Sequence, residues 1–199
     1  MLYRPYGPSA WLIEDIDAPT AWAAGLERMA HLGVHAIVPA KETVLVLCER
    51  VVHDEVGRLF DQVSPVLHRD DEQELTIDVV YDGDDLAEVA EHVGLSCDAV
   101  VQRHTAAPYT VEFCGFSPGF AYLGGLDPAL RIPRRDSPRT RVPAGSVAIA
   151  ADYSCIYPSP SPGGWHLLGS TTADVWDVRR SEPALLTPGT TVRFRRVRP

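Results

Sequence analysis

The segment GFSPGFAYLGG, residues 115–125, places four glycines, one proline and three aromatic side chains within eleven positions. Glycine and proline both disfavour a helix, and large aromatic side chains are costly to leave in water. Such a segment is typical of turns and short strands whose aromatic rings fill a core or line a ligand pocket. It therefore favours a β structure for this half of the chain.

The neighbouring sequence shares this composition. Between Gly115 and Ser170 lie 8 of the 15 glycines and 8 of the 17 prolines. Short alternating runs bounded by turn residues lie within and on either side of this segment, namely YTVEFCGF, VAIAA, HLLGS and TVRFRRV. Because closure into a barrel removes the exposed edges of short strands, we expect residues 75–199 to form a mainly-β barrel. Its first part should be a strand in LTIDVVY followed by two short helices, the second capped by Ser96.

The N-terminal residues follow a different pattern. Their periodicity predicts the order β-α-β-β-α, over residues 9–16, 17–33, 34–40, 43–49 and 51–63. Asp17 is the expected cap of the first helix, and Lys41-Glu42 separates the two strands of a hairpin. This order suits a small ferredoxin-like open sandwich of the α+β class over residues 1–70. The charged segment 67–74 has no periodicity and is the expected linker between the two domains.

Composition narrows the classes of function. The net charge of the 199 residues is −9, which argues against a nucleic-acid partner bound through its phosphates. The charge is uneven, because residues 1–110 carry 20 acidic and 7 basic side chains while residues 111–199 carry 7 and 11. The C-terminal half is therefore the part suited to an anionic ligand.

Targeting and cysteine signals are weak. No apolar run is long enough to cross a bilayer and the first residues lack a signal-peptide pattern, so we expect a cytoplasmic protein without a membrane partner. The four cysteines are scattered and form no CxxC pair, which argues against a zinc site or a disulfide framework. We expect reduced thiols and no metal bound by this chain.

Three clusters carry the candidate site: GFSPGFAYLGGL, PRRDSPRTRVPAGS and IYPSPSPGGWHLLGST. Glycine permits close approach of the backbone to a ligand, aromatic rings can wall a pocket, and guanidinium groups suit carboxylate or phosphate. The predicted substrate-binding residues are Phe116, Pro118, Gly119, Phe120, Tyr122, Arg134, Arg139, Pro143, Ser146, Tyr157, Gly163, Gly164 and Trp165. The alternative is that the same residues only build barrel corners and the barrel core.

Catalytic chemistry is harder to assign. His104 is a possible additional site residue, although a structural role for it and for His166 fits the sequence better. Ser117 and Ser146 lack the GxSxG elbow of a serine nucleophile, and no GxxxxGK[ST] phosphate loop is present. The catalytic residues therefore stay unassigned.

Residues 75–194 resemble the subunit-1 family of so-called allophanate hydrolases. The resemblance is carried, in order, by GFSPGFAYLGGLD, PRRDSPRTRVPAGSVAIA, IYPSPSPGGWHLLGST and LLTPGTTVRF. The N-terminal part is similar only through Gly7–Ala10. The family includes the KipI-type inhibitor of a sporulation histidine kinase, the B subunit of bacterial ATP-dependent 5-oxoprolinase and part of the carboxyltransferase region of urea carboxylase.

The resemblance implies a small α+β domain followed by a cyclophilin-like barrel. It implies a subunit, inactive by itself, of an enzyme that opens the small molecule 5-oxo-L-proline to L-glutamate. ATP would be used through the complex with a homologous second subunit (KipA-type, the C subunit of 5-oxoprolinase) and with a third protein of the A-subunit type. The alternative is a KipI-type regulator of a histidine kinase; a component of allophanate hydrolase or urea carboxylase fits less well.

The sequence departs from the family pattern at two places. Ala121 stands where the family usually has proline. ADYSCIYP, residues 151–158, stands where the family usually reads GxQTGIYP. The second departure lies next to the proposed pocket, so the identity of the ligand stays open at this point.

Overall fold

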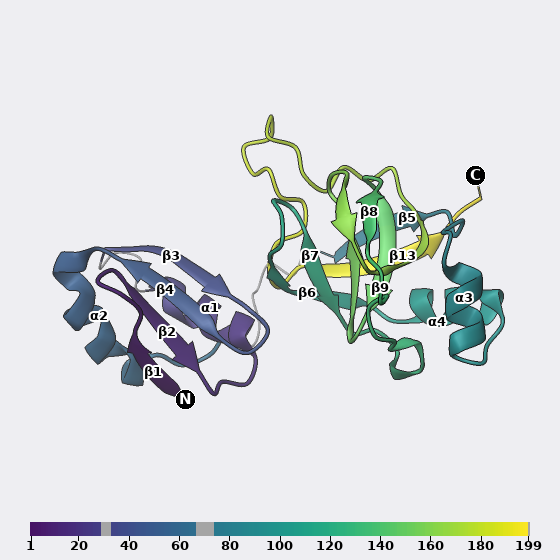
Figure 1. Ribbon diagram of the computed structural model, residues 1–199. Coiled ribbons are helices and arrows are strands. Elements are labelled where there is room, and N and C mark those ends of the chain that lie inside the picture. Colours follow the sequence, from purple (N-terminus) through teal and green to yellow (C-terminus); the bar gives the residue numbers. More distant parts are fainter. Residues whose placement is uncertain (29–32, 67–73, 199) are drawn as a thin grey trace. The chain divides into compact units, whose positions relative to one another are not determined.

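A computed structural model describes residues 1–28, 33–66 and 74–198 of the chain (Figure 1). The chain divides into two compact units, Met1–Glu72 and Gln73–Pro199. Of the expected linker, only Glu74 among residues 67–74 falls within the described residues, and it begins a strand. No helix in the described residues is both long and apolar enough to cross a membrane.

The N-terminal unit contains a four-stranded antiparallel sheet in the order β1-β2-β4-β3. Its strands are β1 (Leu2–Pro5), β2 (Ala10–Glu14), β3 (Val34–Pro39) and β4 (Val44–Cys48). The expected hairpin is confirmed, because β3 and β4 pair antiparallel with Ile37 opposite Val46. Along β4, Val44, Val46 and Cys48 are buried, as alternation requires of a strand with one face on a core.

Two helical segments of this unit differ from the expected ones. Helix α1 spans Pro19–Leu26, and its N-cap position is Ala18 at a φ of 55°, so the prediction of Asp17 as the cap was wrong. The second expected helix is α2 (His53–Leu59) between two 3₁₀ turns, Arg50–Val52 and Phe60–Gln62. Residues 29–32 of the first expected helix lie outside the described residues.

The strand β1 was not expected, because its sequence LYRP is short and ends in proline. In the structure most of its residues are exposed. It pairs with β2 from Leu2 opposite Glu14 to Pro5 opposite Trp11. The sheet therefore gains a strand from the N-terminal end of the chain. The ferredoxin-like class stays a prediction for this unit.

The C-terminal unit contains a seven-stranded sheet in the order β12-β9-β10-β7-β6-β13-β5. The strands are β5 (Glu74–Val79), β6 (Tyr109–Cys114), β7 (Ala121–Gly124), β9 (Ser146–Ala150), β10 (Tyr153–Ile156), β12 (His166–Ser170) and β13 (Thr191–Arg196). The neighbours β5 and β13 are parallel, and the other pairs are antiparallel.

The outer strands of this sheet meet each other. Beyond the end of β5, Val80 N donates to Ser170 O at 2.9 Å and Ser170 N donates to Val80 O at 2.8 Å. A third bond joins Gly83 N to Leu168 O at 3.1 Å. The sheet is therefore nearly closed, in agreement with the expected cyclophilin-like barrel.

Two short helices pack beside the barrel, α3 (Leu86–His92) near β12 and α4 (Cys97–Ala106) near β13. Ser96 caps α4 as predicted, since its Oγ accepts a hydrogen bond from Ala99 N. A separate ribbon pairs β8 (Arg139–Val142) with β11 (Ser161–Gly163), and one 3₁₀ turn spans Pro128–Leu130. The segment between β12 and β13 extends away from the barrel (Figure 1).

Candidate functional site

A pocket of about 80 Å³ brings together the three glycine-rich clusters of the sequence. Most of the predicted substrate-binding residues line it. The lining residues are Phe116, Phe120, Tyr122, Arg134, Tyr157, Pro162, Gly163, Gly164 and Trp165. These residues come from β7 and the turn before it, the loop before β8, the residue after β10, and β11 with the residues that follow it, and only the tertiary fold places them side by side. We call this space the aromatic pocket.

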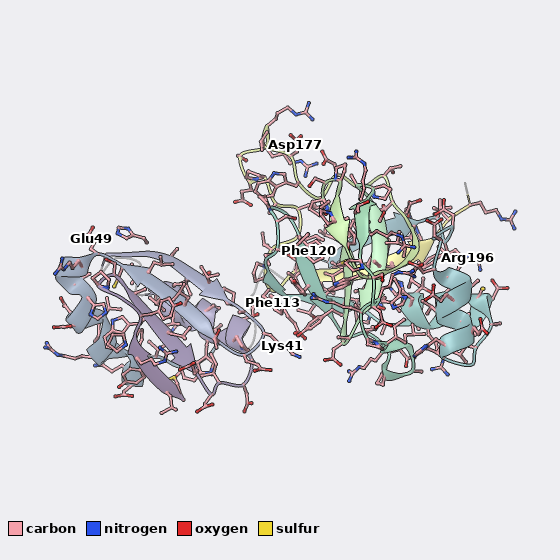
Figure 2. All side chains as sticks on the ribbon, viewed as in Figure 1. Lys41, Glu49, Phe113, Phe120, Asp177 and Arg196 are labelled. Carbon is pink, nitrogen blue, oxygen red and sulfur yellow. The ribbon has the colours of Figure 1, made fainter. Side chains whose placement is uncertain are left out.

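Edge-to-face contacts hold the walls of the aromatic pocket. The ring centroid of Phe120 lies 5.7 Å from that of Trp165 and 5.3 Å from that of Tyr157, with interplanar angles of 89° and 82°. Phe113 and Phe120, both labelled in Figure 2, each contact Tyr122, the first by stacking at a centroid distance of 4.2 Å and the second edge-to-face at 5.2 Å. Contacts of this kind add to the stability gained by burial and keep the rings in fixed positions. The pocket is therefore preformed.

Backbone conformation shapes the mouth of the aromatic pocket. Phe116 has a φ of 67°, and the residue is 63% exposed. A bulky residue rarely adopts this conformation, and such strain is often kept where it serves a function. At Gly163 an added Cβ would overlap the hydroxyl of Tyr157. Glycine is thus required there for the chain to pass close to the ring.

Arg134 supplies the positive charge of the aromatic pocket. Its guanidinium carbon lies 5.9 Å from the centre of the Trp165 ring, within the range of a cation–π contact. Arg134 is exposed, and it makes no ion pair with any residue that the structure describes. A guanidinium held over an indole and free of a carboxylate partner suits an incoming carboxylate or phosphate.

Arg139 lies outside the aromatic pocket, and its predicted contact with a ligand stays a prediction. Its Nη2 donates to Oδ1 of Asp85 at 2.7 Å. Arg135 Nη1 donates to the same oxygen at 2.8 Å, and Leu167 N donates to Oδ2 at 2.7 Å. Burial raises the pKa of Asp85, but the hydrogen bonds from Arg139 and Leu167 N outweigh it and lower the pKa.

Asp85 was missed by the sequence reasoning. It precedes helix α3 in the acidic run DGDD, which is the usual place for a helix cap. In the structure it is the N-cap residue of α3, yet its side chain makes no capping hydrogen bond. Its partners lie 50 to 82 positions away in the sequence, so no local pattern could have revealed them.

The remaining predicted residues lie away from the lining of the aromatic pocket. Pro118 and Pro143 are exposed, and Ser146 is buried at the start of β9. Gly119 is buried with a φ of 80°, and an added Cβ would lie 2.6 Å from Trp176 Cβ. For these four residues a role in ligand binding stays a prediction.

His104 is completely buried in the barrel unit. Its Nδ1 lies 2.7 Å from the Tyr81 hydroxyl, and its Nε2 lies 2.9 Å from Ser154 Oγ. The ring stacks on Phe194 with a centroid distance of 4.7 Å. Burial lowers the pKa of His104 to about 3, so the ring is neutral at ordinary pH. This environment is that of a core histidine whose hydrogen bonds are satisfied.

Among the described residues, side chains that could bind a ligand are easier to identify than a nucleophile or a metal site. Cys155 is buried, and burial raises the pKa of its thiol well above the usual value. Among the residues described, no cluster of three or more His, Cys, Asp or Glu side chains could hold a metal ion. The aromatic pocket therefore provides apolar walls and one cation, an arrangement that suits a small anion carrying a ring.

The chain is similar to a known protein family and to individual known proteins. The family model described as carboxyltransferase domain, subdomain C and D, matches residues 1–186. The B subunit of the 5-oxoprolinase of Escherichia coli O157:H7 is 50% identical over 123 residues, which are 60% of this chain and 56% of that protein. The chain thus matches little more than half the length of this curated relative.

Two solved structures are similar over the whole chain. TTHA0988 superposes with a TM-score of 0.84 at 36% identity, over 100% of this chain and 41% of that one. The conserved uncharacterized protein PH0987 from Pyrococcus horikoshii superposes with a TM-score of 0.62 at 32% identity, over 99% and 98% of the two chains. Both structures support the fold described above.

Proposed function

Because the chain belongs to the family of carboxyltransferase domains, subdomains C and D, we propose that it is one subunit of a 5-oxoprolinase-type hydrolase. In this proposal the complete enzyme uses ATP to open 5-oxo-L-proline to L-glutamate. The relative named as the B subunit of 5-oxoprolinase supports the assignment through its 50% identity over 123 residues. The relatives give no such support to the kinase-inhibitor alternative.

The observation that carries the proposal is the combination of a small aromatic pocket with Arg134 at its mouth. The volume of about 80 Å³ is far below the roughly 300 Å³ at which pockets for drug-sized ligands begin. A five-membered ring suits this space better than a nucleotide does. The carboxylate of 5-oxo-L-proline would bind Arg134 while its ring lies between Phe120 and Trp165.

ATP would then bind elsewhere in the complex. We propose that two further proteins, one homologous to this chain and of the KipA type, the other of the A-subunit type, supply the phosphate chemistry that activates the lactam carbonyl. This chain would position the substrate by binding its ring and its carboxylate. The isolated chain is therefore expected to bind 5-oxo-L-proline without turning it over.

The test is an assay of the assembled complex. The chain is co-purified with both proposed partners, and the release of ADP and glutamate is measured at varied concentrations of 5-oxo-L-proline. Arg134→Ala should lower kcat/KM at least about tenfold, which corresponds to a loss of about 1.4 kcal/mol. Arg131→Ala is the matched control, because Arg131 is exposed and pairs with Asp152 at 3.3 Å outside the pocket.

Two results would contradict the proposal. A complex that forms but consumes no ATP in the presence of 5-oxo-L-proline would remove the assigned reaction. Full activity of the Arg134→Ala complex would keep the reaction but remove the aromatic pocket as the place where the substrate carboxylate binds.

A further inference from the structure

The aromatic pocket depends on a contact between two segments, the loop before β8 and the residues around the start of β12. Two hydrogen bonds join these segments on either side of the cation–π contact made by Arg134. The backbone N–H of Arg135 donates to the carbonyl oxygen of Gly164 at 2.8 Å. The ring of His166 lies with its Nε2 3.0 Å from the carbonyl oxygen of Pro133, and since a carbonyl can only accept, Nε2 is the donor.

Asp85 joins the same two segments from a third part of the chain. Its Oδ1 accepts a hydrogen bond from Arg135 Nη1 at 2.8 Å, and its Oδ2 accepts one from Leu167 N at 2.7 Å. The backbone N–H of Asp85 also donates to the carbonyl oxygen of Leu167 at 3.1 Å. One carboxylate thus connects the neighbour of Arg134 to a residue two positions after Trp165.

The contacts of Asp85 are not those of a helix cap. An aspartate at the N-cap position usually accepts hydrogen bonds from the first backbone N–H groups of its helix. Asp85 occupies this position of α3, but its side chain makes no such bond. Both of its oxygens accept from the two pocket segments instead, and the bond from Arg135 is between charged groups, which makes it stronger than a neutral one.

Asp85 does not itself reach the ligand site. The residue is 2% exposed and is not among those that line the aromatic pocket. Any effect on a ligand must therefore pass through the residues that it holds. Loss of its charge would release the side chain of Arg135, and the adjacent Arg134 would move with the loop. A displacement of about 1 Å in a group that binds the substrate is enough to lower activity strongly.

We propose that Asp85 is a positioning residue that fixes the separation of Arg134 and Trp165 and so preorganises the aromatic pocket for a ring that carries a carboxylate. The identity of this ligand rests on the proposed function, whereas the placement of the two side chains rests on the contacts given above. Because Asp85 acts on the binding of the substrate, its loss should change KM more than kcat.

The first test is made on the assembled complex. Asp85→Asn keeps the size of the side chain and removes its charge. It should raise the KM for 5-oxo-L-proline at least about tenfold and change kcat by less than about threefold. Val192→Ala is the control for a general loss of stability, because Val192 is fully buried in β13, whose neighbours in the sheet are β5 and β6. It should leave KM unchanged.

A double variant separates positioning from an independent effect. If Asp85 acts through Arg134, adding Asp85→Asn to Arg134→Ala should leave the KM of Arg134→Ala unchanged within about twofold. If the two residues acted independently, their effects on KM would multiply.

A second variant is needed because Asp85→Asn removes a buried charge and can prevent folding. Arg135→Gln cuts the same connection at a side chain that is 26% exposed, and Arg139 still pairs with Asp85. It should raise KM in the same way. Glu88→Gln is its control, because Glu88 accepts from the same Nη1 at 2.8 Å but is 57% exposed, where an ion pair contributes little. Its KM should be that of the wild type.

The displacement can also be followed by NMR in the isolated chain. The ring current of Trp165 shifts the Nε–H signal of Arg134 while the guanidinium lies over the indole. Asp85→Asn and Arg135→Gln should move this signal toward that of an arginine that contacts no ring, and Val192→Ala should leave it in place.

The proposal is overturned if Asp85→Asn and Arg135→Gln keep the wild-type KM and the wild-type signal of Arg134. It is also overturned if the effects of Asp85→Asn and Arg134→Ala on KM multiply, or if Val192→Ala raises KM as much as Asp85→Asn does. If the wild-type complex consumes no ATP with 5-oxo-L-proline, the proposed function fails, and the NMR comparison still decides the role of Asp85.

Discussion

Arg139 binds Asp85 inside the barrel unit, with Nη2 at 2.7 Å from Oδ1 and with only 3% of the Asp85 side chain exposed. The pair joins the segment after β5 to the start of β8. Arg135 and the backbone N–H of Leu167 also donate hydrogen bonds to this carboxylate. Arg139 therefore neutralises a buried charge, whatever else it contacts.

This arrangement predicts that Arg139→Ala destabilises the barrel unit. Loss of one partner leaves Asp85 with Arg135 and Leu167 N, so we expect a cost of about 2 kcal/mol, below the 3–5 kcal/mol of a fully broken buried pair. Urea unfolding followed by the indole NMR signal of Trp165 measures it. The matched control is Arg195→Ala, because Arg195 pairs with Asp78 at 2.6 Å on the exposed surface. Equal midpoints for both variants would contradict the assigned role.

The buried His104 predicts a loss of stability in acid. Its pKa is about 3 in the folded chain and near 6.5 when unfolded, so the unfolded chain binds the extra proton between these values. Stability from the neutral ring is complete above pH 6.5 and falls as the pH drops toward 3. Between pH 7.5 and 5 the loss should be about 2 kcal/mol.

Two measurements check the effect of His104. The ring of His104 should show no titration by NMR between pH 7.5 and 5 in the folded chain. His104→Gln should flatten the dependence of the unfolding free energy on pH over the same interval. A native His104 that titrates near pH 6.5 would show that burial does not hold the ring neutral.

The backbone conformation of Ala151 predicts that glycine at this position would stabilise the fold. It connects β9 to β10 at a φ of 51°, a left-handed conformation that costs a residue with a Cβ roughly 1 kcal/mol. Ala151→Gly should therefore raise the unfolding free energy by about 1 kcal/mol. Ala148→Gly, in the middle of β9 and fully buried, should lower it instead. A lower midpoint for both variants would show that the conformation carries no strain.

Replacing Gly119 with alanine should lower the free energy of unfolding through a packing clash as well as through backbone strain. Gly119 and Gly94 both have positive φ, 80° and 68°, but only at Gly119 would a Cβ meet Trp176 Cβ, at 2.6 Å. Gly94→Ala should cost about 1 kcal/mol, and Gly119→Ala roughly 3 kcal/mol. Thermal unfolding of the two variants measures the difference. Similar melting temperatures would mean that the segment carrying Trp176 moves aside freely.

Several features of the fold could be predicted because they depend on neighbouring residues. Alternation of apolar side chains located β4, and Lys41-Glu42 located the turn before it. The glycines and prolines after Gly115 indicated short strands separated by turns. Ser96 was recognised as a cap because its hydrogen bond reaches only to Ala99. Each of these signals is local in the chain, and each is confirmed.

The candidate site could be predicted in part. The aromatic residues and Gly163 were found because large rings and glycines gather in motifs that resemble a known family. From the sequence, Arg134 and Arg139 were selected among the arginines between positions 131 and 141, but nothing in the sequence distinguished these two from each other. In the structure Arg134 faces the aromatic pocket, whereas Arg139 turns to Asp85.

The sequence by itself determined the β character of the barrel unit, the short helices beside it and the identity of the residues that can form a pocket. Local backbone preference and side-chain alternation are sufficient for these. Only the tertiary structure decided that Val80 pairs with Ser170 to bring the outer strands together. The same holds for the ion pairs that Asp85 forms with Arg135 and Arg139. Those contacts join segments at least 50 positions apart, and their energy comes from burial and pairing that no short stretch of the chain contains.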